Sequence, residues 1–162
     1  MKLKHFGKTA SALVSAGVLA GSFALASPAL AAVETIPIND GNVPTTAKGF
    51  EDQSCDNIPP DDISKTEDGW VFVLPASAGA EGNFISVTAT FENANGDERI
   101  RNTDDHGGIV SGSGDNKAYI ITPPGWTLVD AEAEVEDPDD DAFFNLTHTC
   151  PGKPRGGMPS PR

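Results

Sequence analysis

Closely spaced aspartates are the residues of this sequence with the chemistry to bind a cation. In the segment DPDDD, Asp137, Asp139 and Asp141 alternate along the chain, and Ca²⁺ prefers several such oxygen ligands. An EF-hand loop that began at Asp137 would need Gly at its sixth position and Glu at its twelfth, but the sequence has Ala142 and His148 there. We therefore predict no metal site of this type and keep the three aspartates only as weak calcium candidates. The alternative to a looser calcium site is a solvated acidic turn.

Residues that could carry out catalysis are few. The segment VSGSG resembles the Gly-x-Ser-x-Gly nucleophile elbow, but Ile109 stands in the first Gly position for Ser111, and Ser111 stands there for Ser113. His106 and His148 are the histidines that follow residue 31, and neither belongs to a His-Glu-x-x-His motif. We predict no catalytic residues, no enzyme activity and no cofactor.

The two cysteines, Cys55 and Cys150, do not form a Cys-x-x-Cys pair. Outside the cytoplasm, two thiols in one small domain usually oxidise to a disulfide; two free buried thiols are the alternative. A Cys55–Cys150 bridge would close a loop of about 96 residues, which is worth roughly 4 to 5 kcal/mol in the loop-entropy model. We predict that this bridge joins the first and last elements of the folded domain.

The first 31 residues have the pattern of a secretory leader. Lysines at positions 2, 4 and 8 precede an uncharged apolar stretch, and small residues at positions 29 and 31 form the site that a signal peptidase recognises. We predict cleavage between Ala31 and Ala32, which leaves a secreted protein without a membrane segment. The alternative is a retained anchor, but the stretch is short and rich in Ala, Gly and Ser.

Composition divides the rest of the chain into three parts. Residues 32–54 are polar and interrupted by Pro and Gly, and we predict a mostly flexible N-terminal segment with a hint of a strand at Ile36 and Ile38. Residues 55–150 are predicted to form the domain. Residues 151–162 contain four prolines, three glycines and no large aliphatic residue, which predicts a disordered tail.

The chain is strongly acidic. The leader holds three of the 11 basic residues and none of the 24 acidic ones, so residues 32–162 have 8 basic and 24 acidic residues and a net charge of −16. Such a charge repels nucleic acid and anionic membrane surfaces. The partners that remain are cell-wall components or a basic molecule, although most of these carboxylates are expected simply to be solvated.

Short apolar runs alternate with turn residues between the cysteines, as is typical of an all-β domain. In residues 84–91, every second residue from Ile85 to Phe91 is apolar, which predicts a half-buried strand. The Asn-Gly pair at 95–96 predicts a hairpin. Further strands are predicted at 70–74, 99–102, 118–122 and 143–150, with a short element at 109–110.

Residues 126–136 change the parity of their apolar positions. Trp126 and Leu128 fall on one face and later apolar residues on the other, which predicts a bulge or bend near Val129-Asp130. The three glutamates of this run are then predicted to face solvent: Glu132, Glu134 and Glu136. A helix over DAEAEVE is the alternative, since Ala and Glu favour it.

Six or seven short strands in about 95 residues predict an antiparallel β-sandwich of about seven strands, Ig-like and stapled by one disulfide. Its large core residues are predicted to be Trp70, Phe72, Phe91, Tyr119, Trp126 and Phe144. The alternative for these aromatic residues is an exposed platform for a glycan.

Four segments, taken in order, resemble a small exported domain of streptomycetes and related actinobacteria. They are DGWVFVLP, FISVTATF, AYIITPPGWTLVDAEAEV and FFNLTHTC, within about residues 55–152. The resemblance implies a cell-surface role and carries over no activity and no binding residues. Many such domains continue into a Leu-Pro-x-Thr-Gly sorting signal and an apolar anchor, whereas this chain stops at Arg162 without them. We expect free secretion or non-covalent wall association; a truncated gene is the alternative.

Together these features predict a secreted, monomeric, non-enzymatic module of the cell envelope or cell surface. The first alternative is a calcium- or glycan-binding extracellular module. A more distant alternative is an uncharacterised hydrolase.

Overall fold

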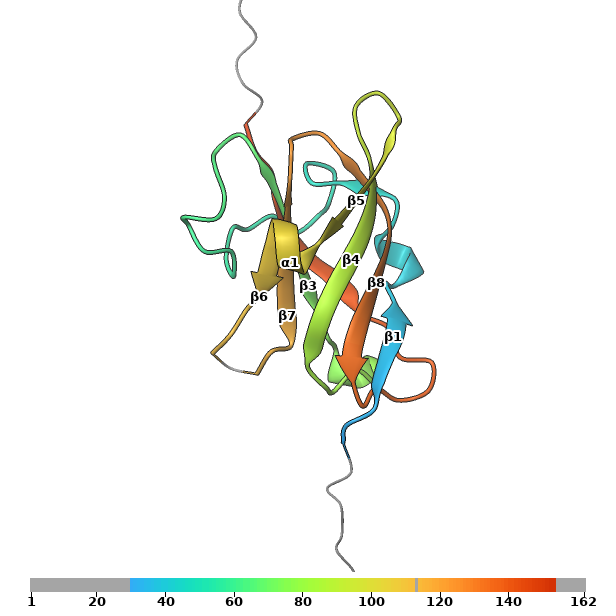
Figure 1. Cartoon of the computed structure of the whole chain (residues 1–162). Coiled ribbons are helices and arrows are strands. Elements are labelled where there is room, and N and C mark those ends of the chain that lie inside the picture. Colours follow the sequence, from blue (N-terminus) through green and yellow to red (C-terminus); the bar gives the residue numbers. More distant parts are fainter. Residues whose placement is uncertain (1–29, 113, 154–162) are drawn as a thin grey trace, which may run out of the picture.

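The computed structural model describes residues 30–112 and 114–153. Residues 1–29 of the predicted leader and 154–162 of the predicted tail lie outside the described residues. The described chain forms two antiparallel sheets that lie face to face (Figure 1). The predicted antiparallel β-sandwich is therefore confirmed.

The first sheet has five strands, with β8 between β1 and β4 and with β5 at the far edge. The short strand β2 also pairs with β8, beyond the end of β1. The strands are β1 (Val33–Pro37), β2 (Thr45–Thr46), β4 (Phe84–Glu92), β5 (Glu98–Asn102) and β8 (Thr127–Glu136).

The second sheet has four strands in the order β6-β7-β3-β9. The strands are β3 (Asp68–Val73), β6 (Gly107–Ile109), β7 (Lys117–Thr122) and β9 (Asn145–Cys150). Three short helical turns join the strands: η1 (Asp40–Asn42), η2 (Ala76–Ala78) and α1 (Thr103–His106). The central strand β3 is buried on both faces, which explains why residues 70–73 are apolar without alternation.

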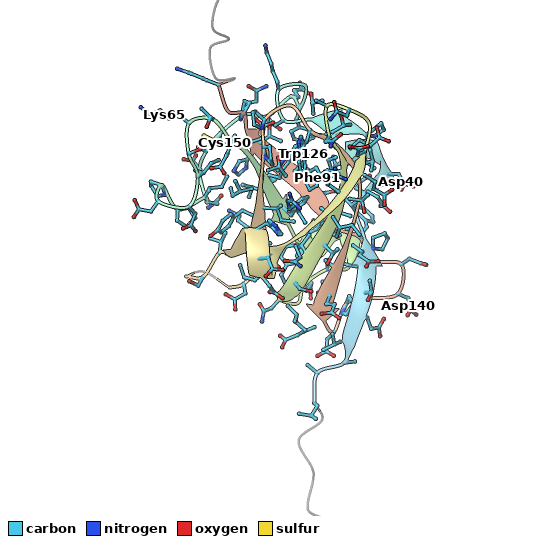
Figure 2. All side chains as sticks on the ribbon, turned by 45° about the horizontal axis from the view of Figure 1, so that its top comes forward. Asp40, Lys65, Phe91, Trp126, Asp140 and Cys150 are labelled. Atoms are coloured by element: carbon cyan, nitrogen blue, oxygen red, sulfur yellow. A yellow bond between two sulfur atoms is a disulfide. The ribbon has the colours of Figure 1, made fainter. Side chains whose placement is uncertain are left out.

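Aromatic side chains fill the space between the sheets. The Phe91 ring lies between Trp70 and Trp126, with centroid distances of 5.2 and 6.1 Å, and Figure 2 shows Phe91 beside Trp126 in the interior. All six predicted aromatic core residues are buried, so an exposed platform made of these rings is ruled out. Tyr119 belongs to a separate small cluster with Ile58, described below.

Strand β8 has the predicted bulge. Thr90 pairs with Asp130 and Phe91 with Leu128, so Val129 is an extra residue in the ladder. Beyond it, Ala131, Ala133 and Val135 are buried and the glutamates between them face outward. The predicted strand over DAEAEVE and its acidic outer face are confirmed.

The start of β4 corrects one expectation. Ile85 was predicted to share the buried face, but it is 39 % exposed and Phe84 is buried in its place. A register shift between Phe84 and Ser86 causes this change, because a one-residue bulge reverses the face of the residue before it.

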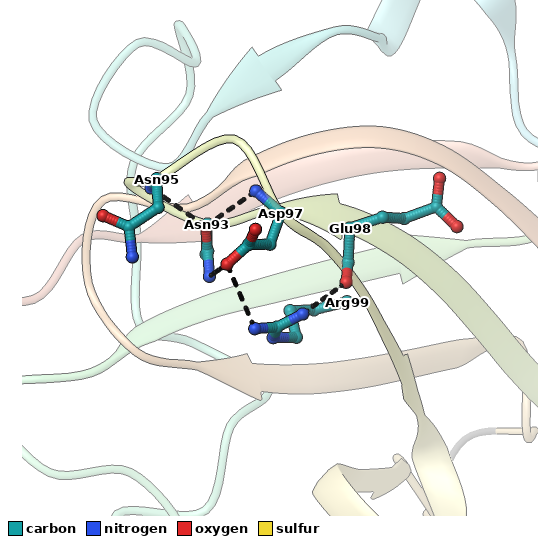
Figure 3. Close-up of polar contacts among 5 residues, drawn as sticks. All are labelled: Asn93, Asn95, Asp97, Glu98 and Arg99. Atoms are coloured by element: carbon teal, nitrogen blue, oxygen red, sulfur yellow. Dashed lines mark hydrogen bonds and ion pairs between the residues drawn. The ribbon is translucent and has the colours of Figure 1, made fainter.

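The predicted hairpin joins β4 to β5 through residues 93–97, drawn in Figure 3. The Asn93 side-chain oxygen accepts hydrogen bonds from the backbone N–H groups of Asn95 and Asp97, each at 2.9 Å. Gly96 has φ 80°, the left-handed conformation that a tight turn requires here. The hairpin is confirmed.

The boundary predicted at Cys55 is wrong, because the sandwich includes residues 33–54. Ile36 and Ile38 are buried in the main core, and β1 completes the edge of the first sheet. Ala47 is also buried, and its carbonyl accepts a hydrogen bond from the Thr149 hydroxyl at 2.7 Å. The polar N-terminal segment is ordered because its few apolar side chains contact the core and its backbone pairs with β8.

Candidate functional site

The predicted disulfide between Cys55 and Cys150 is present. Cys150 ends β9, the last strand, but Cys55 lies in the loop that follows β2, so the bridge does not join the first element to the last. This part of the expectation is corrected, because β1 and β2 precede Cys55. The bridge instead fixes the loop before β3 to the end of β9.

The loop after Cys55 covers the outer face of the second sheet. Ile58 from this loop is buried with Val71, Tyr119 and Cys150, and Ile63 packs against them. This second, small cluster is separate from the core between the sheets. The loop thereby brings the carboxylate of Asp62 to the Tyr119 side chain.

A polar cleft of about 400 Å³ opens beside this loop. Its walls come from the loop, from β5, from α1 with the start of β6, and from β7. The lining residues are Asp62, Glu67, Arg101, Asp105, His106, Gly107, Tyr119, Ile121, Thr122 and Pro123. Three of the lining residues are carboxylates and one is a guanidinium, so both hydrogen-bond acceptors and donors line the cleft.

Tyr119 is the most strongly perturbed titratable group of the cleft. Its hydroxyl donates a hydrogen bond to Asp62. Burial, followed by this hydrogen bond and by the negative charge of Asp62, raises the pKa of Tyr119 to about 12. Tyr119 is therefore a protonated donor at neutral pH and not a base.

His106 is at the end of α1 and lines the same cleft. Partial burial, and then the positive charge of Arg101, lower the pKa of His106 below its usual value of 6.5, while Asp105 acts in the opposite direction. Its buried Nδ1 atom has no hydrogen-bond partner within the described protein. At neutral pH the ring is uncharged and has one nitrogen free to bond with a ligand or water.

The position of α1 depends on its two ends. The Asn102 side chain accepts a hydrogen bond from the Asp105 backbone N–H at 2.8 Å, which caps the first turn. After the helix, a Cβ at Gly107 would overlap the backbone carbonyl of Tyr119. Glycine therefore lets β6 approach β7 closely and holds His106 beside Tyr119's strand.

Arg101 connects the cleft to the core. Its guanidinium lies 4.8 Å from the centre of the Trp126 ring, an arrangement that favours a cation. Trp126 is 8 % exposed, so Arg101 covers the ring and the ring is not offered to a ligand. The polar side chains that line the cleft, unlike the covered Trp126 ring, can form hydrogen bonds with a ligand.

Asp68 lies under the adjacent turn and has a structural role. It is buried, and its two carboxylate oxygens accept hydrogen bonds from the backbone N–H groups of Gly125 and Gly152, at 2.8 and 2.7 Å. The carboxylate thus ties the β7–β8 turn and the segment after Cys150 to β3. Each of the two carboxylate oxygens of Asp68 therefore binds a backbone amide of the fold.

The weak calcium candidates do not come together as a site. Within residues 30–112 and 114–153, no three metal-ligating side chains of the His, Cys, Asp or Glu types converge. Asp137 and Asp141 have φ of 45° and 63° in the turn after β8, and the Asp139 N–H donates to the Gly79 carbonyl. Asp137 instead contacts the start of β1, because its carboxylate accepts a hydrogen bond from the Ala32 N–H.

His106 and His148 lie in different parts of the fold. His148, on β9, is bonded through Nε2 to the Asp56 backbone carbonyl at 2.8 Å, whereas His106 lines the cleft. Sequence reasoning missed the other cleft residues because Asp62 and Tyr119 are 57 positions apart. The one available signal was the polar DDHGG segment, which places His106 beside Asp105.

In the described part of the chain, every helix is far too short to cross a membrane; α1 has four residues and the two 3₁₀ turns have three each. Comparisons of the chain with models of protein families, with curated proteins and with solved structures found no match.

The single tyrosine of the sequence makes the Tyr119–Asp62 contact directly testable. Tyrosinate absorbance after a rapid pH jump should show Tyr119 ionising near pH 12 in the native protein and near pH 10 in denaturant. Because the folded state binds the proton more tightly, its contribution to the free energy of unfolding is present below pH 10 and is lost as pH rises through 12. Asp62→Asn should lower the pKa of Tyr119 in the native protein, and Asp140→Asn should leave that pKa unchanged. Native ionisation near pH 10 would contradict the contact.

Proposed function

We propose that this chain is an exported, non-enzymatic module of the cell envelope or cell surface, and that it acts as a monomer. The observation that carries the proposal is the Cys55–Cys150 disulfide. Disulfides form and persist in oxidising compartments and are rare in the cytoplasm. A structural bridge that closes most of the domain is therefore typical of a protein that works outside the cell.

The position of the first strand supports export as well. β1 begins at Val33, one residue after the proposed N-terminus at Ala32. Cleavage between Ala31 and Ala32 would leave every described strand intact, since the leader contributes none of them. A leader that ends where the fold begins is the arrangement that processing during export requires.

Fractionation of cells that produce the full chain tests this proposal. We expect the protein in the culture supernatant or in wall extracts, with Ala32 as its first residue. N-terminal sequencing measures the start, and mass with and without reductant measures the disulfide. A start at Met1 would contradict processing, and a start near Lys48 would contradict it too, because that product lacks β1.

We propose glycan binding as a second candidate function, because the polar cleft offers the groups that bind sugars. Its carboxylates accept hydrogen bonds, while Arg101 and the unpartnered nitrogen of His106 provide further polar contacts. The hydroxyl groups of a sugar are both donors and acceptors, so they match such a mixed lining. Calcium is a poorer candidate, because within residues 30–112 and 114–153 the suggested aspartates do not converge with other metal-ligating side chains.

Titration with simple sugars and with soluble wall fragments, followed by amide NMR, tests the cleft. We expect shifts at β5, α1 and β7, and weaker binding in Arg101→Gln and Asp105→Asn. Asp140→Asn, a charge change on a distant turn, is the matched control and should bind as the unaltered protein does. Shifts confined to other strands, or no shift with any glycan, would contradict this second function and leave the proposed export unaffected.

A further inference from the structure

The N-terminal edge of the fold is built around one side chain, Asp137. Its Oδ1 atom accepts a hydrogen bond from the backbone nitrogen of Ala32 at 2.6 Å, and its own backbone N–H donates to the Ala32 carbonyl at 2.7 Å. The two residues extend the β1–β8 ladder by one pair, next to Val33 and Glu136. The backbone N–H and C=O of Ala32 are thus both bound by Asp137, the residue that follows β8.

The backbone of Asp137 is shaped for this contact. Its φ of 45° lies in the left-handed region, which Asp and Asn adopt far more readily than other residues with a side chain. Ala31 and Ala32 are exposed, and Leu30 is 91 % exposed. The bond between Ala31 and Ala32 therefore lies at the surface, directly beside a carboxylate.

We propose that Asp137 is the binding site for the α-ammonium group that removal of the leader creates at Ala32. This inference rests on the processing step of the proposed function. In that step water adds to the Ala31 carbonyl carbon and the C–N bond breaks. The water oxygen stays on the leader in the Ala31 carboxylate, and the two water protons go to the Ala32 nitrogen, which becomes an ammonium group. The amide N–H that now donates to Asp137 is replaced, at the same position, by a cation with three N–H donors.

The charge on that nitrogen decides the strength of the contact. An α-amino group has a pKa of about 7.7 to 8.0 and is mainly protonated at neutral pH. A hydrogen bond between two ionised groups is stronger than one between a neutral amide and a carboxylate. The neighbouring carboxylates of Glu136 and Asp139 to Asp141 add negative potential at this end of the sandwich. The acidic DPDDD segment then serves the chain's own N-terminus.

The position of cleavage matters in this arrangement. A product that began at Ala31 would keep a neutral amide on Asp137 and would carry its ammonium group one residue away, roughly 3.5 Å farther along the chain. Only a chain that begins at Ala32 places the charge on the carboxylate.

Acylation of the α-amino group tests the proposal. The processed protein, beginning at Ala32, is treated at neutral pH with a limiting amount of an acetyl ester, and the N-terminal peptide is quantified by mass spectrometry. We expect the α-amine to react roughly three- to tenfold faster in Asp137→Asn than in the unaltered protein, because an ion pair raises the amine pKa by about half to one unit. Asn also tolerates the left-handed conformation, so the turn is kept.

Two controls separate the pair from general charge effects. Asp140→Asn removes the same charge from the same exposed turn, where Figure 2 labels Asp140, and should change the rate far less than Asp137→Asn does, because Asp140 adds only to the general negative potential. In a chain that begins at Ala31, the amine should react at one rate with either Asp or Asn at position 137. Equal rates in the unaltered protein and Asp137→Asn would overturn the proposal. An incorrect cleavage site would be seen separately by N-terminal sequencing, and a fusion cut to begin at Ala32 would still allow the rate comparison.

Discussion

Loss of the Cys55–Cys150 bridge should lower the free energy of unfolding by about 2 to 5 kcal/mol. The bridge closes a loop with a sequence separation of 95 residues, so its removal returns a large conformational freedom to the unfolded chain. Replacing both cysteines with Ser removes the bridge and little else, since the two side chains are similar in size. Denaturant unfolding measures the change as a lower midpoint.

The folded state should also change near the bridge in that variant. Cys150 packs with Ile58, Val71 and Tyr119, so the loop over the second sheet loses one of its fixed points. Amide exchange should increase in that loop and remain slow in β4 and β8. Reduction of the unaltered protein is the control and should reproduce the loss. Equal stability of the oxidised and reduced proteins would show that the bridge contributes nothing.

Phe91→Ala should be strongly destabilising, with a loss of about 3 to 5 kcal/mol. The ring is fully buried and contacts two tryptophans, Trp70 and Trp126. Its removal leaves a cavity that Trp70 cannot fill without breaking the hydrogen bond from its ring nitrogen to the Thr122 hydroxyl, at 3.0 Å. Trp126 could fill it only by leaving the Arg101 guanidinium, which lies 4.8 Å from its ring centre. Thermal unfolding with a tryptophan fluorescence readout measures the loss.

Ile100→Ala is the matched control for Phe91. Ile100 lies on the neighbouring strand β5 and is 58 % exposed, so its truncation should change stability by less than about 0.5 kcal/mol. Similar losses in both variants would mean that the sheets are not packed through the aromatic layer.

Local pattern was enough to predict most strands. Strict alternation identified β4 and β8, the change of parity located the bulge at Val129, and the Asn-Gly pair located the turn before β5. These features depend on neighbours in sequence, and the sequence shows them directly. The disulfide followed from counting the cysteines.

Features that depend on distant residues were not predictable in this way. β1 has one buried apolar residue, Ile36, and forms a strand because its backbone pairs with β8. Ile85 is exposed because of a bulge between Phe84 and Ser86, and no Gly or Pro within residues 84–86 predicts that bulge. The cleft unites residues from the loop after Cys55, from α1 and from β7, so its composition became apparent only in the folded chain.

The disulfide also determines which part of the protein a pulling force would reach. The described chain starts at one end of the sandwich and finishes at the opposite end, blue and red in Figure 1. Tension between these ends passes along residues 32–54, crosses the bridge from Cys55 to Cys150, and bypasses the 94 residues enclosed between them. Only the first segment can then be drawn out, by roughly 80 Å instead of the roughly 400 Å of an unbridged chain. Under load β1 and β2 would detach from the domain while the cleft stays folded, because the Cys55–Cys150 disulfide prevents further extension.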